Sequence, residues 1–157
     1  RWLTRGLSMR YETLLRTTRV LVERQAAFLA EGDEAMAPLT LKEVADEIGM
    51  HESTVSRITS GKYIQTPRGT FELKHFFAVR LEGANVSGAA VKAMVKRLIE
   101  SEPAGRPLAD DAIAALLARQ GVHIARRTVA KYREQLSIPT ARERRRAAAT
   151  PALARAS

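Results

Sequence analysis

Apolar residues recur three and four positions apart through most of the chain, which is the spacing of amphipathic α-helices. The first of these patterns runs from Tyr11 to Ala30 and predicts a long helix that ends near Gly32. Aromatic residues make up only 5% of the chain, so aliphatic helix packing is the expected source of stability. With the patterns that follow, we expect a mainly α fold of two small helical modules, each with a helix-turn-helix, joined by a short linker.

A helix-turn-helix is predicted in the first module. Thr40 and Glu43 have the spacing of a capping box, so a helix is expected to start at Leu41. Gly49 can supply the positive φ of the turn, and a second helix is expected from about Glu52. The residues expected to pack where the two helices cross are Ala45, Val55 and Ile58.

The second helix of this motif carries polar side chains that suit DNA. Short hydrogen-bonding groups and one arginine stand on its N-terminal half and outer faces, where they could meet phosphates and base edges. The candidate DNA-binding residues are Ser53, Thr54, Ser56 and Arg57. A plain helical hairpin with a polar surface has the same pattern, so both interpretations stay open.

Helical periodicity gives way to turn-forming residues after Gly61. The run Thr-Pro-Arg-Gly at 66–69 predicts a short hairpin or wing, and aromatic residues around Phe71 and Phe76 are expected to seal the module. Periodicity lapses again near Gly83, where we place the domain boundary. The expected domains are residues 1–82, residues 83–140 and a disordered basic tail, residues 141–157.

Three helices are predicted in the second module. A cap at Ser87 or Asn85 opens the first, and the second runs from about Asp110 to Gly121. The third spans about residues 125–136 and follows the glycine turn, so the last two helices have the layout of a second helix-turn-helix.

The third helix of this module has an apolar face, with Val129 and Tyr132, and a basic face opposite. Its arginines could enter a major groove and bind guanine through two hydrogen bonds. The candidate DNA-binding residues are Arg126, Arg127, Thr128, Lys131 and Arg133, with Arg133 on the flank. A basic face that is merely solvated is the alternative.

The formal net charge of +9 is concentrated in one segment. Residues 125–146 hold eight basic and two acidic side chains, whereas residues 1–124 hold 17 basic and 15 acidic ones. This distribution favours a local polyanion-binding site over a generally cationic protein, although a solvated basic tail remains open. The tail arginines expected to add nonspecific phosphate affinity are Arg142, Arg144, Arg145 and Arg146.

Catalytic, metal-binding and membrane functions find no support in the sequence. The chain has no phosphate-binding Gly-Lys loop and no Gly-x-Ser-x-Gly elbow, so neither an enzyme nor a cofactor is expected. Cysteine is absent and the three histidines are scattered, so no metal site is expected. The longest wholly apolar run, residues 112–118, is too short to span a bilayer, and we expect a cytoplasmic protein.

Several segments resemble one bacterial family. Residues 125–134, Ala-Arg-Arg-Thr-Val-Ala-Lys-Tyr-Arg-Glu, resemble the complete RpoN box, the ten-residue signature of enhancer-dependent sigma-54 factors. The similarity extends over nearly the whole stretch from Trp2 to Pro139. Segments similar to the central part of that family are residues 41–45, 51–57, 62–63, 66–69 and 71–74.

The resemblance implies a promoter-recognising function. The box helix would read an upstream GG-containing element, called minus 24, with Arg127 as the guanine reader and Arg126 and Lys131 close by. The central helix-turn-helix would lie near a downstream GC element, called minus 12, with Arg57 as its arginine. The chain would thereby direct RNA polymerase to these promoters for activator-dependent transcription initiation.

The resemblance also implies partners: double-stranded promoter DNA, core RNA polymerase and a bacterial enhancer-binding activator ATPase. The activator would act mainly through regions absent here, because the family's N-terminal activator-responsive region is missing. Residues from about 2 to 30 resemble the end of its core-binding region, so we expect the chain to be a C-terminal fragment. A two-headed repressor or transposase-like module would share both helix-turn-helix motifs without needing polymerase, and a structural adaptor could use its basic helices to meet acidic partners.

Overall fold

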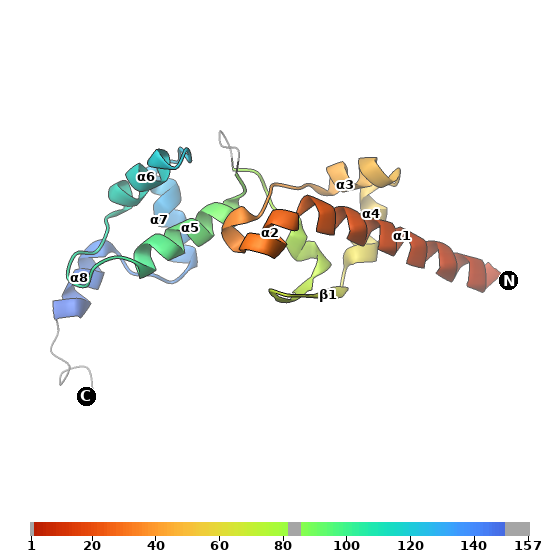
Figure 1. Ribbon diagram of the computed structural model, residues 1–157, viewed down its shortest axis with the longest axis horizontal. Coiled ribbons are helices and arrows are strands. Elements are labelled where there is room, and N and C mark those ends of the chain that lie inside the picture. The colour runs from red at the N-terminus through yellow and green to blue at the C-terminus, as the bar shows by residue number, and fades with distance from the viewer. Residues whose placement is uncertain (1, 82–85, 150–157) are drawn as a thin grey trace, which may run out of the picture. The chain divides into compact units, whose positions relative to one another are not determined.

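The computed structural model describes residues 2–81 and 86–149, with only the backbone described for residues 2–9. These residues form eight α-helices, two 3-10 helices and one two-stranded sheet, so the expected mainly α fold is confirmed (Figure 1). The chain divides into two compact units, Arg1–Ala90 and Val91–Ser157. This division falls within the first turn of α5 (Gly88–Glu100), whereas the boundary expected near Gly83 lies outside the described residues.

Two helices stand where the sequence predicted one. α1 (Trp2–Arg24) and α2 (Ala26–Glu31) are interrupted at Gln25, and the 3-10 helix η1 (Asp33–Ala35) follows. The Gln25 side chain is fully buried, and its amide donates to the carbonyls of Ala37 and Phe76, each at 2.8 Å. The Gln25 carbonyl accepts from the Ala37 N–H at 2.9 Å. The break therefore places an amide where three segments of the unit meet.

The predicted hairpin is present. β1 (Tyr63–Thr66) pairs antiparallel with β2 (Gly69–Glu72). Arg68, in the turn between them, donates hydrogen bonds to the backbone carbonyls of Leu29 and Ala30 near the end of α2. The hairpin tip is thus tied to the helical layer, where a guanidinium satisfies carbonyls that the ending helix leaves open.

An aromatic cluster seals the first unit, as expected. Phe28 of α2 makes edge-to-face contacts with Phe71 at 5.5 Å and Phe76 at 5.8 Å between ring centroids. His75 stacks on Phe71 at 5.0 Å. Phe76 ends the 3-10 helix η2 (Leu73–Phe76), which closes the hairpin onto the core.

The second unit holds most of α5 and all of α6 (Asp110–Arg119), α7 (Arg126–Gln135) and α8 (Ala141–Ala149). Its fully buried apolar side chains come from three of these helices and are Val91, Val95, Ile113, Leu117 and Val129. At the start of α5 the Ser87 hydroxyl accepts from the Ala90 N–H at 3.1 Å, so Ser87 supplies the cap that the sequence predicted there. The same hydroxyl donates to the Met36 carbonyl at 2.6 Å.

Candidate nucleic-acid interface

The first helix-turn-helix has the local geometry that the sequence predicts. Thr40 Oγ1 accepts from the Glu43 N–H at 3.1 Å, and the Glu43 carboxylate accepts from the Thr40 N–H at 3.2 Å, so a capping box begins α3 (Leu41–Ile48). Gly49 ends this helix in the left-handed region with φ 70°. Ala45 is buried, and α3 packs against α4 (Glu52–Thr59).

The candidate residues of α4 differ in exposure. Ser53 and Arg57 are exposed, whereas Thr54 and Ser56 are half-buried. His51 caps the helix, because its Nδ1 accepts from the Ser53 N–H at 3.2 Å and lies 2.8 Å from the Ser53 hydroxyl. Sequence reasoning missed this cap, since histidine is not among the favoured capping residues. The His51 cap therefore holds Ser53 in place, and Arg57 is the exposed cation of this helix.

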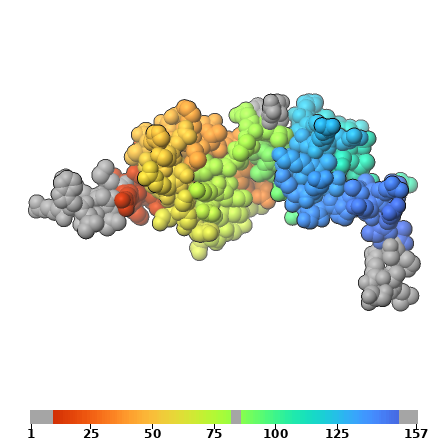
Figure 2. All heavy atoms as spheres, turned by 180° about the vertical axis from the view of Figure 1, so that it is seen from behind, coloured from red at the N-terminus to blue at the C-terminus, as the bar shows by residue number. Residues whose placement is uncertain are grey.

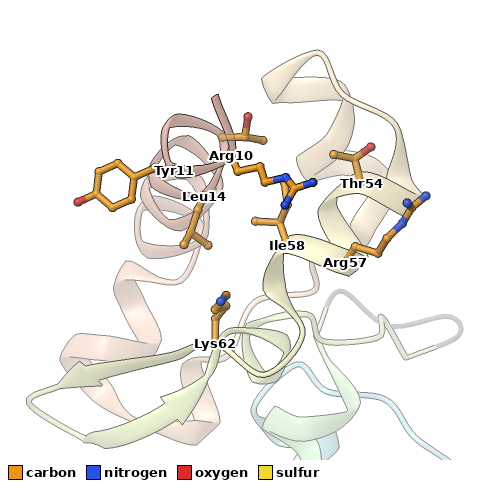
Figure 3. A pocket seen from close by; sticks show the side chains of 8 residues that line it. Arg10, Tyr11, Leu14, Thr54, Arg57, Ile58 and Lys62 are labelled. Atoms are coloured by element: carbon orange, nitrogen blue, oxygen red, sulfur yellow. The ribbon is translucent and has the colours of Figure 1, made fainter. Parts of the chain in front are cut away.

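A hollow of about 710 Å³ lies between α1 and α4 (Figure 3). Its lining is basic at three positions and consists of Arg10, Tyr11, Thr13, Leu14, Thr54, Arg57, Ile58 and Lys62. Figure 3 shows Arg10 reaching from α1 toward α4, with Arg57 pointing away from α1. Ile58, expected in the core, is half-buried at this hollow. Thr59 takes the fully buried position instead, and its hydroxyl donates to the Val55 carbonyl at 2.8 Å.

The second helix-turn-helix consists of α6, a turn at Gly121 with φ 83°, and α7. Val129 and Tyr132 anchor α7 on its buried side, as the sequence predicts. Burial raises the pKa of the Tyr132 hydroxyl above its usual value near 10. The ammonium of Lys131 lies 5.9 Å from the centroid of the Tyr132 ring and makes a cation–π contact with it.

The basic face of α7 is open at its N-terminal end. Arg126, Arg127 and Lys131 are exposed, and Thr128 is half-buried. Ala125 stands at the cap position and offers no side-chain acceptor, so no side chain caps the first turn. Open N–H groups beside two arginines give this end of the helix the chemistry of an anion-binding surface.

The flank position expected for Arg133 is wrong. This residue is only 5% exposed, and its Nε and Nη2 donate to the two carboxylate oxygens of Asp110 at 3.0 and 3.3 Å. Its Nη1 donates to the Ile138 carbonyl at 3.0 Å. Arg133 follows Val129 by four positions and so lies on the buried side of α7. It joins the two helices of the motif to each other, and it is not available to DNA.

The disorder expected after residue 140 is wrong for residues 141–149, which form α8, while the rest of the expected tail lies outside the described residues. Arg144 is not a free phosphate-binding group either. Its guanidinium donates to both carboxylate oxygens of Glu102 at 2.8 and 3.1 Å, and the two side chains are each 12% exposed. Arg142, Arg145 and Arg146 are exposed.

Over residues 2–81 and 86–149, no helix is both long and apolar enough to cross a membrane. In the same part of the chain, no three acidic or histidine side chains converge as a metal site would require.

A family model described as "Sigma-54, DNA binding domain" matches residues 1–146. The chain belongs to this family. Its homologues are sigma factors, which are not enzymes.

Two sigma-54 relatives show how far the likeness extends. The RNA polymerase sigma-54 factor of Pseudomonas aeruginosa (strain UCBPP-PA14) is 50% identical over 149 residues, which cover 93% of this chain and 30% of that protein. The factor of Escherichia coli (strain K12) is 47% identical over 148 residues, which cover 92% and 31%. The chain therefore spans about three tenths of the length of these relatives.

A solved structure of the same family is also similar. The crystal structure of Aquifex aeolicus sigmaN bound to promoter DNA has a TM-score of 0.66 and 43% sequence identity to this chain. The match covers 91% of this chain and 44% of that one.

Proposed function

We propose that this chain recognises promoter DNA at two elements as the DNA-binding part of a sigma-54 factor. Its second motif would read the upstream minus 24 element through the RpoN box, residues 125–134, and its first would lie at the downstream minus 12 element. The observation that carries the proposal is the N-terminal end of α7, where two exposed arginines stand on a helix whose other side is anchored in the core. The family match and the likeness to a DNA-bound sigmaN structure support it.

Arg127 is the proposed reader of guanine. It lies in the first turn of α7, and a guanidinium there can donate to O6 and N7 of one guanine in the major groove. Arg126, Thr128 and Lys131 stand beside it and would contact the same groove or its phosphates. Arg133 has no part in this contact, because its guanidinium is taken up by Asp110.

In the first unit, Arg57 is the proposed DNA-contacting residue, with Ser53, Thr54 and Ser56 on the same helix. Elements named twelve positions apart lie on nearly the same face of B-DNA, whose turn is about 10.5 base pairs. Two recognition helices on one chain are therefore compatible with reading both elements. Core RNA polymerase and an activator ATPase are the proposed protein partners, and the cytoplasm is the proposed compartment.

The test is a binding titration of wild type and Arg127→Ala on two duplexes, one with the GG element and one with GG replaced. The variant should lose about 1–3 kcal/mol of binding free energy on the GG duplex and little on the other, because one base-specific contact is removed. Arg119→Ala is the matched control, an exposed arginine in the last turn of α6. A variant that keeps the wild-type preference for GG would contradict the assignment. Footprinting of Arg57→Ala should show weaker protection at the downstream element alone.

A further inference from the structure

α8 divides its arginines between two sides of one helix. Arg142, Arg145 and Arg146 are spaced three and four residues apart, so they share a face, and all three are exposed. Arg144 lies on the opposite side and is the one arginine of this helix that is mostly buried. Figure 2 shows the surface of α8, in dark blue, open to solvent.

The inward side of α8 is attached by polar contacts. The Arg144 guanidinium binds both oxygens of Glu102 and also donates to the carbonyls of Leu108, at 2.7 Å, and Pro139. Glu102 in turn accepts from the Leu108 N–H at 2.7 Å, so the carboxylate is held from two directions.

The N-terminus of α8 is also capped. The Thr140 hydroxyl accepts from the Glu143 N–H at 3.2 Å, and the Glu143 carboxylate accepts from the Thr140 N–H at 3.1 Å, which is a capping box. No apolar residue of α8 is buried, and an isolated helix of nine residues is marginal in water. The contacts of Arg144 with Glu102 and Leu108 therefore hold α8 against the rest of the second unit.

We propose that α8 is a phosphate-binding helix, docked on the rest of the second unit by the Arg144–Glu102 ion pair, that contacts the DNA backbone beside the site bound by α7. The docking fixes the outward arginines in one place, unlike those of a flexible basic tail. No acidic partner of Arg142 or Arg145 is present among the residues that the structure describes. A backbone contact of this kind adds affinity and sets register without reading sequence. The inference rests on the proposed function, since α7 must bring the duplex to this unit.

The first experiment removes the outward charges. Arg142→Ala/Arg145→Ala in the full chain is titrated against duplexes with and without GG over a range of salt concentrations. The plot of log affinity against log salt should become shallower by about 1.8, because each phosphate contact contributes about 0.9. Affinity should fall equally on both duplexes, and the preference for GG should stay. The matched control is Lys96→Ala/Arg97→Ala, which removes two exposed cations of α5.

The second experiment releases the helix. Glu102→Ala makes the chain more positive by one charge, so a flexible tail would bind DNA more tightly. A docked helix gives the opposite result: weaker binding on both duplexes, together with lower helix content by circular dichroism.

The outcomes separate this inference from the proposed function. A wild-type salt slope in Arg142→Ala/Arg145→Ala, an equal loss in the α5 control, or tighter binding by Glu102→Ala would each overturn the phosphate-binding helix. A wild-type chain that binds both duplexes equally would instead overturn the reading of GG by α7, because the effect of α8 is measured on either duplex.

Discussion

The ion pair between Arg133 and Asp110 is expected to be the main polar contact that holds the second helix-turn-helix together. Breaking a buried pair costs about 3–5 kcal/mol, because the remaining charge is left buried without a partner. Here the Arg133 side chain is 7% exposed and that of Asp110 is 23% exposed, so water partly solvates the carboxylate left behind. Asp110 also lies in the first turn of α6, where the helix dipole favours a negative charge by about 0.3–1 kcal/mol. Arg133→Ala should therefore cost about 2–3 kcal/mol.

Hydrogen exchange of the α6 and α7 amides is the suitable assay, since it reports the free energy of opening for this unit separately from the first. Arg133→Lys should lose most of the same stability, because an ammonium cannot reproduce two parallel bonds to Asp110 and a third to Ile138. Arg126→Ala is the control, an exposed arginine of the same helix, and should change stability by less than about 0.5 kcal/mol. If Arg133→Ala changes the α6 and α7 opening energies no more than this control does, the pair is not what holds the motif.

Two further predictions concern the cores of the units. Ala45→Leu should overpack the crossing of α3 and α4 at a cost of about 1–3 kcal/mol in urea unfolding, and unchanged stability would mean that the helices do not meet at Ala45. The raised pKa of Tyr132 predicts that stability is fully present below the unfolded value near 10 and falls as pH rises through the folded value, because the folded state keeps the proton longer. Tyr132→Phe should lack this part of the alkaline loss, and parallel stability profiles of the two proteins above pH 10 would refute the assignment.

Short-range patterns in the sequence predicted most of the first helix-turn-helix and the hairpin that follows it. The Thr40–Glu43 box, the glycine turn at Gly49 and the hairpin at residues 66–69 depend on residues that are neighbours along the chain, so their spacing contains the necessary information. The break at Gln25 could not be predicted in this way. Its amide is satisfied by Ala37 and Phe76, and the second of these lies 51 positions away.

Two of the basic residues were not placed correctly from the sequence for the same reason. Arg133 and Arg144 counted toward a basic surface, yet their partners lie 23 and 42 residues earlier in the chain. The sequence did contain one usable signal, because Arg133 follows the buried Val129 by four positions and must share its side of the helix. No comparable apolar pattern marked Arg144, since α8 has only alanine beside its charges. The roles of Arg127 and Arg57 in binding DNA stay predictions.

The buried amide at Gln25 fixes the C-terminal end of α1 in the core of the first unit. A helix of 23 residues is about 34 Å long at 1.5 Å per residue. A rotation of about 5° at its Gln25 end would carry the opposite end through about 3 Å, by the geometry of a rod of that length. Arg16 donates to the Ile48 carbonyl at 2.7 Å, and Arg24 pairs with Glu47 at 3.0 Å, so α1 is also bound to α3 along its length. A displacement of the N-terminal end of α1 would therefore be transmitted through these contacts to α3, the first helix of the first helix-turn-helix.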